Sequence, residues 1–269
     1  RRWDEIAPLP EARSKFSSVQ NKDTDIYIFG GNGPSSRRME SVTETTPSVF
    51  VYRTSIDAWE GLSSMSEMRT GAVSLRVNDK DSHYLVIGGR KGMRALRSCE
   101  MYDVEEDSWL PVSTSLLTPR FGAGGGWIRG SAYVVGGRSE NARQRTMERW
   151  DCREKGFQWC PSLSVARCWG IHICAGDCLY AFGGSPINSL SGEVFDVRKG
   201  SWHSLPLLPS ENSWGWGGSG TTSPFSTPLS FQCQQQQQQH QRGVVIMGMG
   251  GNNTQRQEEE EGETREEEE

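Results

Sequence analysis

One short unit, an apolar run that ends in two glycines, recurs along the 269-residue chain about every fifty residues. The copies are IYIFGG (26–31), YLVIGG (84–89), AYVVGG (132–137) and LYAFGG (179–184), with a weaker one, VVIMGMGG, at 244–251. A repeat of this length constrains the fold strongly, because each copy must form the same small unit and stack on its neighbours.

Three further landmarks accompany the glycine pairs Gly30–Gly31, Gly88–Gly89, Gly136–Gly137 and Gly183–Gly184. Aromatic–aspartate pairs follow at Tyr102–Asp103, Trp150–Asp151 and Phe195–Asp196. Tryptophans come next, at Trp59, Trp109, Trp159 and Trp202. An arginine then precedes small residues, at Arg13, Arg69, Arg120 and Arg167.

Each repeat divides into four short β-rich segments separated by turn residues, which we call strands A to D. In the third repeat they are expected near 121–128, 131–137, 146–151 and 158–163. Such a unit is one twisted antiparallel sheet that cannot bury both of its faces alone. The pattern therefore predicts an all-β propeller, with the tryptophans burying apolar area between blades.

The glycine pair, the aromatic–aspartate pair and the tryptophan together resemble the kelch repeat family, strongly from residue 1 to about 209 and weakly over 213–251. We expect a kelch β-propeller with four good repeats, at about 13–65, 69–115, 120–165 and 167–208. A degenerate fifth repeat at 213–251 is interrupted by a Ser/Thr/Pro/Gln-rich insertion at 221–242 that contains a polyglutamine run. No strand C follows in this repeat before the acidic tail, which leads us to expect an open or incomplete ring.

Glycine pairs after a strand also occur in phosphate-binding turns, so a nucleotide site is an alternative. A phosphate loop runs from a strand through glycines into a helix, whose first amides hold the anion. Here GGRSENARQRTMERWD leads into another strand, so we do not expect a nucleotide.

No metal or cofactor is expected either. The seven cysteines include no paired CxxC, and free thiols are the simpler interpretation. Some kelch propellers are copper oxidases or sugar mutarotases, which leaves an enzyme as the alternative. Copper requires clustered ligands, and the four histidines, at 83, 172, 203 and 240, are scattered. We therefore expect a protein that is not an enzyme.

Charge is unevenly distributed. Residues 258–269 hold nine Glu and one Arg, and the remaining 257 residues carry a net +3. We expect residues 252–269 to form an acidic disordered tail. Since neighbouring strands are antiparallel, the B–C loops and the D–A junctions share one face, which we call the rim. The rim holds 14 basic and 5 acidic residues, whereas the turns on the opposite face hold 8 basic and 10 acidic residues.

Arginine forms bidentate bonds to carboxylate and phosphate, so the rim is the candidate binding surface. In kelch receptors of ubiquitin ligases, arginines at two of these repeat positions hold acidic peptides. The resemblance implies the same here, although Ser185 replaces an arginine in the fourth repeat and CWG adds a residue after Arg167. The predicted partner contacts are Arg69, Arg90, Arg94, Arg120, Arg138, Arg143 and Arg167.

The expected function is a protein-binding module for an acidic or phosphorylated peptide, in the cytoplasm or the nucleus. It would serve as a substrate adaptor for a cullin-type ubiquitin ligase through a BTB or F-box domain outside this chain. A general scaffold is the alternative. We expect neither nucleic acid nor a membrane as partner, because aromatic residues do not alternate with the basic loops and no apolar run spans a bilayer.

Overall fold

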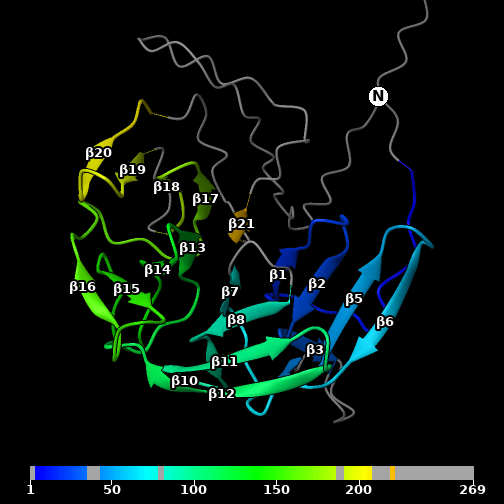
Figure 1. Cartoon of the computed structure of the whole chain (residues 1–269). Helices are drawn as coiled ribbons and strands as arrows, with labels where there is room; N and C mark the ends of the chain where they lie inside the picture. Colours follow the sequence, from blue (N-terminus) through cyan, green and yellow to red (C-terminus); the bar gives the residue numbers. More distant parts are fainter. Residues whose placement is uncertain (1–3, 35–42, 78–81, 186–190, 208–218, 222–269) are drawn as a thin grey trace, which may run out of the picture.

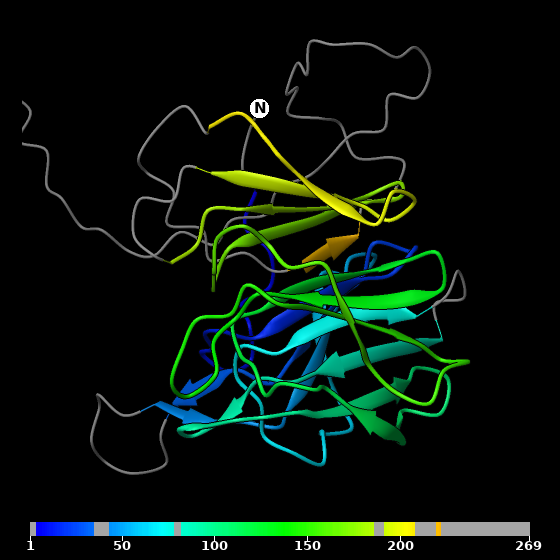
Figure 2. The same ribbon diagram turned by 90° about the vertical axis from the view of Figure 1, so that its left-hand side faces the viewer.

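The computed structural model describes residues 4–34, 43–77, 82–185, 191–207 and 219–221. Four antiparallel four-stranded sheets follow one another in an arc around a central axis (Figure 1). Seen from the side, successive sheets lie as separate layers (Figure 2). This arrangement confirms the predicted all-β propeller. No helix that could cross a bilayer is found among the residues described.

The first blade consists of β1 (Ser17–Gln20), β2 (Ile26–Phe29), β5 (Val49–Arg53) and β6 (Ala58–Leu62). The second contains β7 (Val73–Val77), β8 (His83–Ile87), β11 (Ser98–Asp103) and β12 (Ser108–Ser115). The third contains β13 (Gly124–Ile128), β14 (Ser131–Val135), β15 (Met147–Asp151) and β16 (Gln158–Cys160). The fourth contains β17 (Ile171–Ala175), β18 (Cys178–Phe182), β19 (Gly192–Asp196) and β20 (Ser201–Ser204).

Two small hairpins extend the B–C loops. One pairs β3 (Asn32–Pro34) with β4 (Thr43–Thr45), and the other pairs β9 (Arg90–Lys91) with β10 (Arg94–Ala95). The last described strand, β21 (Ser219–Thr221), pairs in parallel with β17 and also contacts β1, β7 and β13. It therefore lies at the centre of the arc (Figure 1). The rest of the expected fifth repeat, the insertion from 222 and the acidic tail lie outside the described residues.

The hydrophobic cores lie between blades. Tyr27 and Phe29 of the first blade pack with Tyr84 and Tyr102 of the second. Similar clusters join the second blade to the third and the third to the fourth. The stacking confirms the expected architecture, because each sheet buries its apolar face only against its neighbour.

The glycine pairs lie where one blade meets the next. The first glycine of the third pair, Gly136, has a φ of +66°, and a Cβ there would come within 2.6 Å of the Arg167 carbonyl oxygen. The second, Gly137, donates its backbone N–H to that same oxygen at 2.8 Å. Gly31 and Gly89 donate in the same way to Arg69 and Arg120. The glycines therefore serve the architecture, since only they leave room for the adjoining backbone.

The aromatic–aspartate pairs end the third strand of the second, third and fourth blades. Asp103, Asp151 and Asp196 each accept backbone N–H groups of the turn that follows. Tryptophan rings pack on the aromatic partner in three blades. The ring centroids lie 5.1 to 5.3 Å apart for Tyr52–Trp59, Tyr102–Trp109 and Phe195–Trp202.

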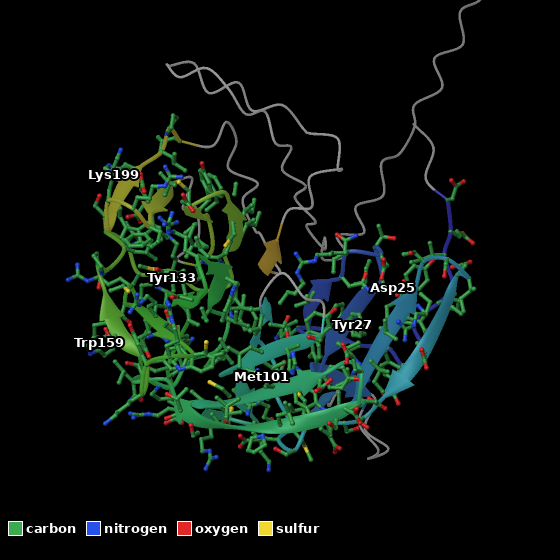
Figure 3. All side chains as sticks on the ribbon, viewed as in Figure 1. Asp25, Tyr27, Met101, Tyr133, Trp159 and Lys199 are labelled. Atoms are coloured by element: carbon green, nitrogen blue, oxygen red, sulfur yellow. The ribbon has the colours of Figure 1, made fainter. Side chains whose placement is uncertain are left out.

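The third blade differs from the expectation for Trp159. Phe157 occupies the tryptophan position there, only 5% exposed and stacked on Trp150 with ring centroids 6.1 Å apart. Trp159 lies on the outer side of the arc and is 55% exposed (Figure 3). The reason is spacing. The ring that packs on the aromatic partner comes seven residues after it in every blade, and that place falls on Phe157. Trp159 is therefore not part of the repeat signature.

Candidate functional site

The arginines at the D–A junctions lie inside the blades. The side chains of Arg69, Arg120 and Arg167 are 0–1% exposed. Each donates from Nη1 to the carbonyl oxygen of the first glycine of its own blade's pair, at 2.7 to 2.9 Å. Nη1 also donates to the carbonyl oxygen of one residue at the start of strand C or directly before it, and Nη2 donates to the hydroxyl of that same residue. The accepting residues are Ser98, Thr146 and Ser191.

A buried glutamate completes each group. Arg69 donates to Glu100 at 2.9 Å, Arg120 to Glu148 at 2.5 Å and Arg167 to Glu193 at 2.9 Å. The same carboxylates accept backbone N–H groups of the preceding junction, from Ser66, Leu117 and Ser164. One ion pair thus joins strand C, the glycine turn and the D–A junction of every one of these blades.

The lowered pKa of Glu193 shows that these contacts stabilise the charged form of a buried carboxyl. Burial alone would raise the pKa of the carboxyl, yet the backbone N–H of Ser164 and the Arg167 guanidinium hold the pKa below its ordinary value. Removal of one member of such a pair leaves a buried charge without a partner and costs about 3–5 kcal/mol.

The first blade uses a variant of the same arrangement. Arg13 donates to the carbonyl oxygens of Gly30 and Ser48, but Phe50 stands where the other blades have glutamate. The guanidinium carbon lies 4.8 Å from the centre of the Phe50 ring, and Nη2 pairs with Glu11 at 2.6 Å. A cation–π contact thus takes the place of the buried ion pair.

The burial corrects the prediction for Arg69, Arg120 and Arg167. Their guanidinium groups are turned into the blade and bonded to its own acceptors, so a partner at the surface does not reach them. The physical reason is the recurring glutamate of strand C, which provides a closer anionic partner than any ligand. We assign these three arginines to the scaffold.

The other predicted contacts lie at the rim. Arg90 and Arg138 directly follow glycine pairs and bridge, through their backbones, to Thr70 and Phe121. Arg138 and Arg143 are exposed, and they form a bridge with each other across their loop. Arg94 is also exposed, with Nη2 3.4 Å from Glu67. Arg90 is half-buried, and its guanidinium carbon lies 5.1 Å from the centre of the Phe121 ring.

The rim remains basic once the buried arginines are set aside. Among the described residues, its accessible basic side chains are Lys15, Arg90, Lys91, Arg94, Arg97, Arg138, Arg143 and Arg145. Its acidic ones are Glu11, Glu44, Glu67 and Glu140. These eight basic and four acidic side chains give the described part of the rim a net charge of +4. Two of these loops touch, because Ala95 donates its backbone N–H to the Glu140 carboxylate at 3.2 Å.

The segment after Arg167 contains no added residue, contrary to the sequence interpretation of CWG. Trp169 donates its backbone N–H to Gly122 in the way that Gly122 donates to Gly71. Trp169 therefore replaces the glycine at this repeat position, and Gly170 falls where the other blades have Ala72 and Ala123. The spacing Arg-x-Gly of the second and third repeats was a signal for this alignment.

No group of three or more His, Cys, Asp or Glu side chains that could hold a metal ion occurs in the described part of the chain. His83, His172 and His203 lie on β8, β17 and β20.

A model of the Kelch motif matches residues 85–115, which run from β8 to the end of β12. The chain thus contains a kelch motif and is similar to kelch-repeat proteins. Kelch-like protein 35 of Mus musculus is 26% identical over 224 residues, 78% of this chain and 34% of that protein. Kelch repeat and BTB domain-containing protein 8 of Danio rerio is 24% identical over 219 residues, 79% of this chain and 33% of that protein. An F-box/kelch-repeat protein of Arabidopsis thaliana is 34% identical over 93 residues, 34% of this chain and 23% of that protein.

The chain spans about a third of the length of the first two of these relatives. Among solved structures, that of YjhT matches with a TM-score of 0.60 at 14% identity, over 77% of this chain and 68% of that chain. At that identity the likeness concerns the fold alone.

Proposed function

We propose that this kelch protein is a binding module, without enzymatic activity, that docks an acidic or phosphorylated peptide on its rim. The observation that carries the proposal is the exposure of Arg94, Arg138 and Arg143 on the loops of two adjoining blades. Accessible guanidinium groups bind carboxylate and phosphate through paired hydrogen bonds. Arg90, which is half-buried on the same hairpin as Arg94, adds a fourth cation.

The ligase role belongs to the same proposal. One relative is named for its BTB domain and another for its F-box. We propose that the propeller recognises substrates, in the cytoplasm or the nucleus, for a cullin-type ligase that it joins through a domain outside this chain.

Charge reversal tests the binding surface. We expect Arg138→Glu combined with Arg143→Glu to weaken binding of an acidic peptide at least about tenfold, because each exposed side chain changes from attraction to repulsion. The probe is a synthetic peptide with the sequence of residues 258–269, added in trans and followed by fluorescence anisotropy. Its phosphorylated counterpart has phosphothreonine in place of threonine.

The matched control carries Lys155→Glu and Lys199→Glu, two exposed changes on the turns of the opposite face. It has the same net charge as the rim variant. Equal weakening by both variants, or no weakening by the rim variant, contradicts the proposed surface.

A further inference from the structure

One residue of each blade occupies the same left-handed backbone position, two residues after the junction arginine. These residues are Lys15, Gly71, Gly122 and Trp169, with φ values of 56°, 64°, 59° and 59°. A chain of backbone hydrogen bonds links them. Gly71 donates to Lys15 at 2.8 Å, Gly122 to Gly71 at 2.8 Å and Trp169 to Gly122 at 2.7 Å. The four positions therefore surround the central axis on the rim side.

Glycine suits this position, and two blades have it. A side chain at a φ near +60° is strained for L residues, and bulky ones are rarely found there. The first and fourth blades nevertheless hold Lys15 and Trp169. Local backbone strain of this kind persists only where the surrounding structure enforces it, and such positions cluster at active sites and ligand-binding sites.

The side chains of Lys15 and Trp169 lie next to each other, and the Trp169 ring covers Gly71 and Gly122. A Cβ on Gly71 would lie 2.5 Å from the Trp169 ring, and one on Gly122 would lie 2.7 Å from it. The indole therefore rests directly on the backbone of the second and third blades. The Nζ of Lys15 lies 5.9 Å from the centre of the same ring.

A second cation lies next to Phe121, an aromatic neighbour of Trp169. Phe121 packs against Trp169 with ring centroids 6.1 Å apart, and the Arg90 guanidinium carbon lies 5.1 Å from the Phe121 ring. Burial lowers the pKa of Lys15, and the positive charge of Arg90 adds to this effect, so the two cations lie within electrostatic reach. Lys15, Arg90 and Trp169 are all half-buried, and the Nε of Arg90 has no hydrogen-bond partner among the described residues.

We propose that Lys15, Arg90 and Trp169 form an anchor subsite at the centre of the rim. It binds one anionic group of the partner, a carboxylate or a phosphate, between the two cations, with the indole as an apolar floor. This inference rests on the proposed function and deepens it. The outer arginines attract the acidic segment, and the anchor fixes the position of one of its side chains.

The strain supplies a test that separates binding from structure. Lys15→Gly removes one cation and also relieves the left-handed backbone. We expect this variant to melt at the same temperature as the wild-type chain or higher, and to bind the acidic peptide about tenfold more weakly. A structural role for Lys15 gives the opposite result, lower thermal stability with unchanged affinity, and would overturn the proposal. The matched control is Lys155→Gly, an exposed change on a turn of the opposite face, which we expect to leave the affinity within about twofold.

Two peptides distinguish the anion. One carries a glutamate and the other a phosphoserine in the same neutral Gly/Ser sequence, and both are titrated against the full chain and against Lys15→Gly. Dependence on Lys15 in either titration supports the anchor and identifies the anion it prefers, whereas no dependence in both overturns it. If the Arg138→Glu/Arg143→Glu variant loses binding and Lys15→Gly keeps it, the anchor is rejected and the rim proposal stands.

Discussion

Arg120 donates a hydrogen bond to Glu148 at 2.5 Å, although neither side chain is more than 1% exposed. The pair lies inside the third blade, and equivalent pairs lie in the second and fourth. These arginines recur because each blade needs the same internal link, and not because a partner contacts each blade in the same way.

Removal of this link should therefore affect folding. We expect Arg120→Met to lower the free energy of unfolding by about 3–5 kcal/mol, because Glu148 would keep a buried charge without its partner. Urea unfolding followed by tryptophan fluorescence measures the change. Any loss of peptide binding in this variant should follow the loss of folded protein. A variant that keeps wild-type stability and loses binding would return Arg120 to the binding surface.

Phe157 and Trp159 of the third blade should behave in opposite ways. Phe157→Ala empties a buried site next to Trp150 and should cost about 3–5 kcal/mol. Trp159→Ala changes an exposed side chain and should stay within about 0.5 kcal/mol. The same unfolding experiment compares them. A larger loss for Trp159→Ala would show that Trp159 fills the core position after all.

His172 should make the protein sensitive to acid. Burial, with the positive charge of Arg167 as the second cause, lowers the pKa of its imidazole from 6.5 to about 4. Between about pH 4 and pH 6.5, the unfolded chain therefore binds a proton at His172 that the native state does not bind. The free energy of unfolding should be fully retained above pH 6.5 and fall by about 3 kcal/mol on acidification to pH 4.

A variant isolates this contribution from the carboxylates. We expect His172→Asn to lose less stability than the wild-type chain between pH 7.5 and pH 4. Identical pH dependence of urea unfolding in the two proteins would show that His172 does not keep its lowered pKa.

The acidic segment 258–269 should compete with an acidic partner for the rim. A tethered segment has a high effective concentration, so even weak binding reduces the apparent affinity for a peptide in trans. We expect its deletion to tighten peptide binding, and more so at low salt, where charges are less screened. Unchanged affinity on deletion at low salt would show that the segment does not reach the rim.

Much of this architecture could be predicted from the sequence. The period of the glycine pairs fixes the blades, and the alternation of short β segments fixes their four strands. The turn into the next strand after Gly137 correctly separates an architectural glycine pair from a phosphate loop. These features are local and repeat in register, so each copy supports the others.

The candidate site was harder to predict, because a recurring arginine is typical both of a binding face and of an internal ion pair. Burial decides between the two, and it depends on where strand C places Glu100, Glu148 and Glu193. Those glutamates recur at one repeat position, and that recurrence was the available signal. The contact of Lys15 with Trp169 joins the first and fourth blades, so no local pattern indicates it.

The most direct test of the rim as the binding surface is a hydrogen-exchange footprint of the full chain with and without the acidic peptide. We predict slower exchange at residues 90–95 and 138–143 and around Lys15 and Trp169, with no change at the turns that follow Asp103, Asp151 and Asp196. Protection confined to those turns, or no protection at the rim at a saturating peptide concentration, would contradict it.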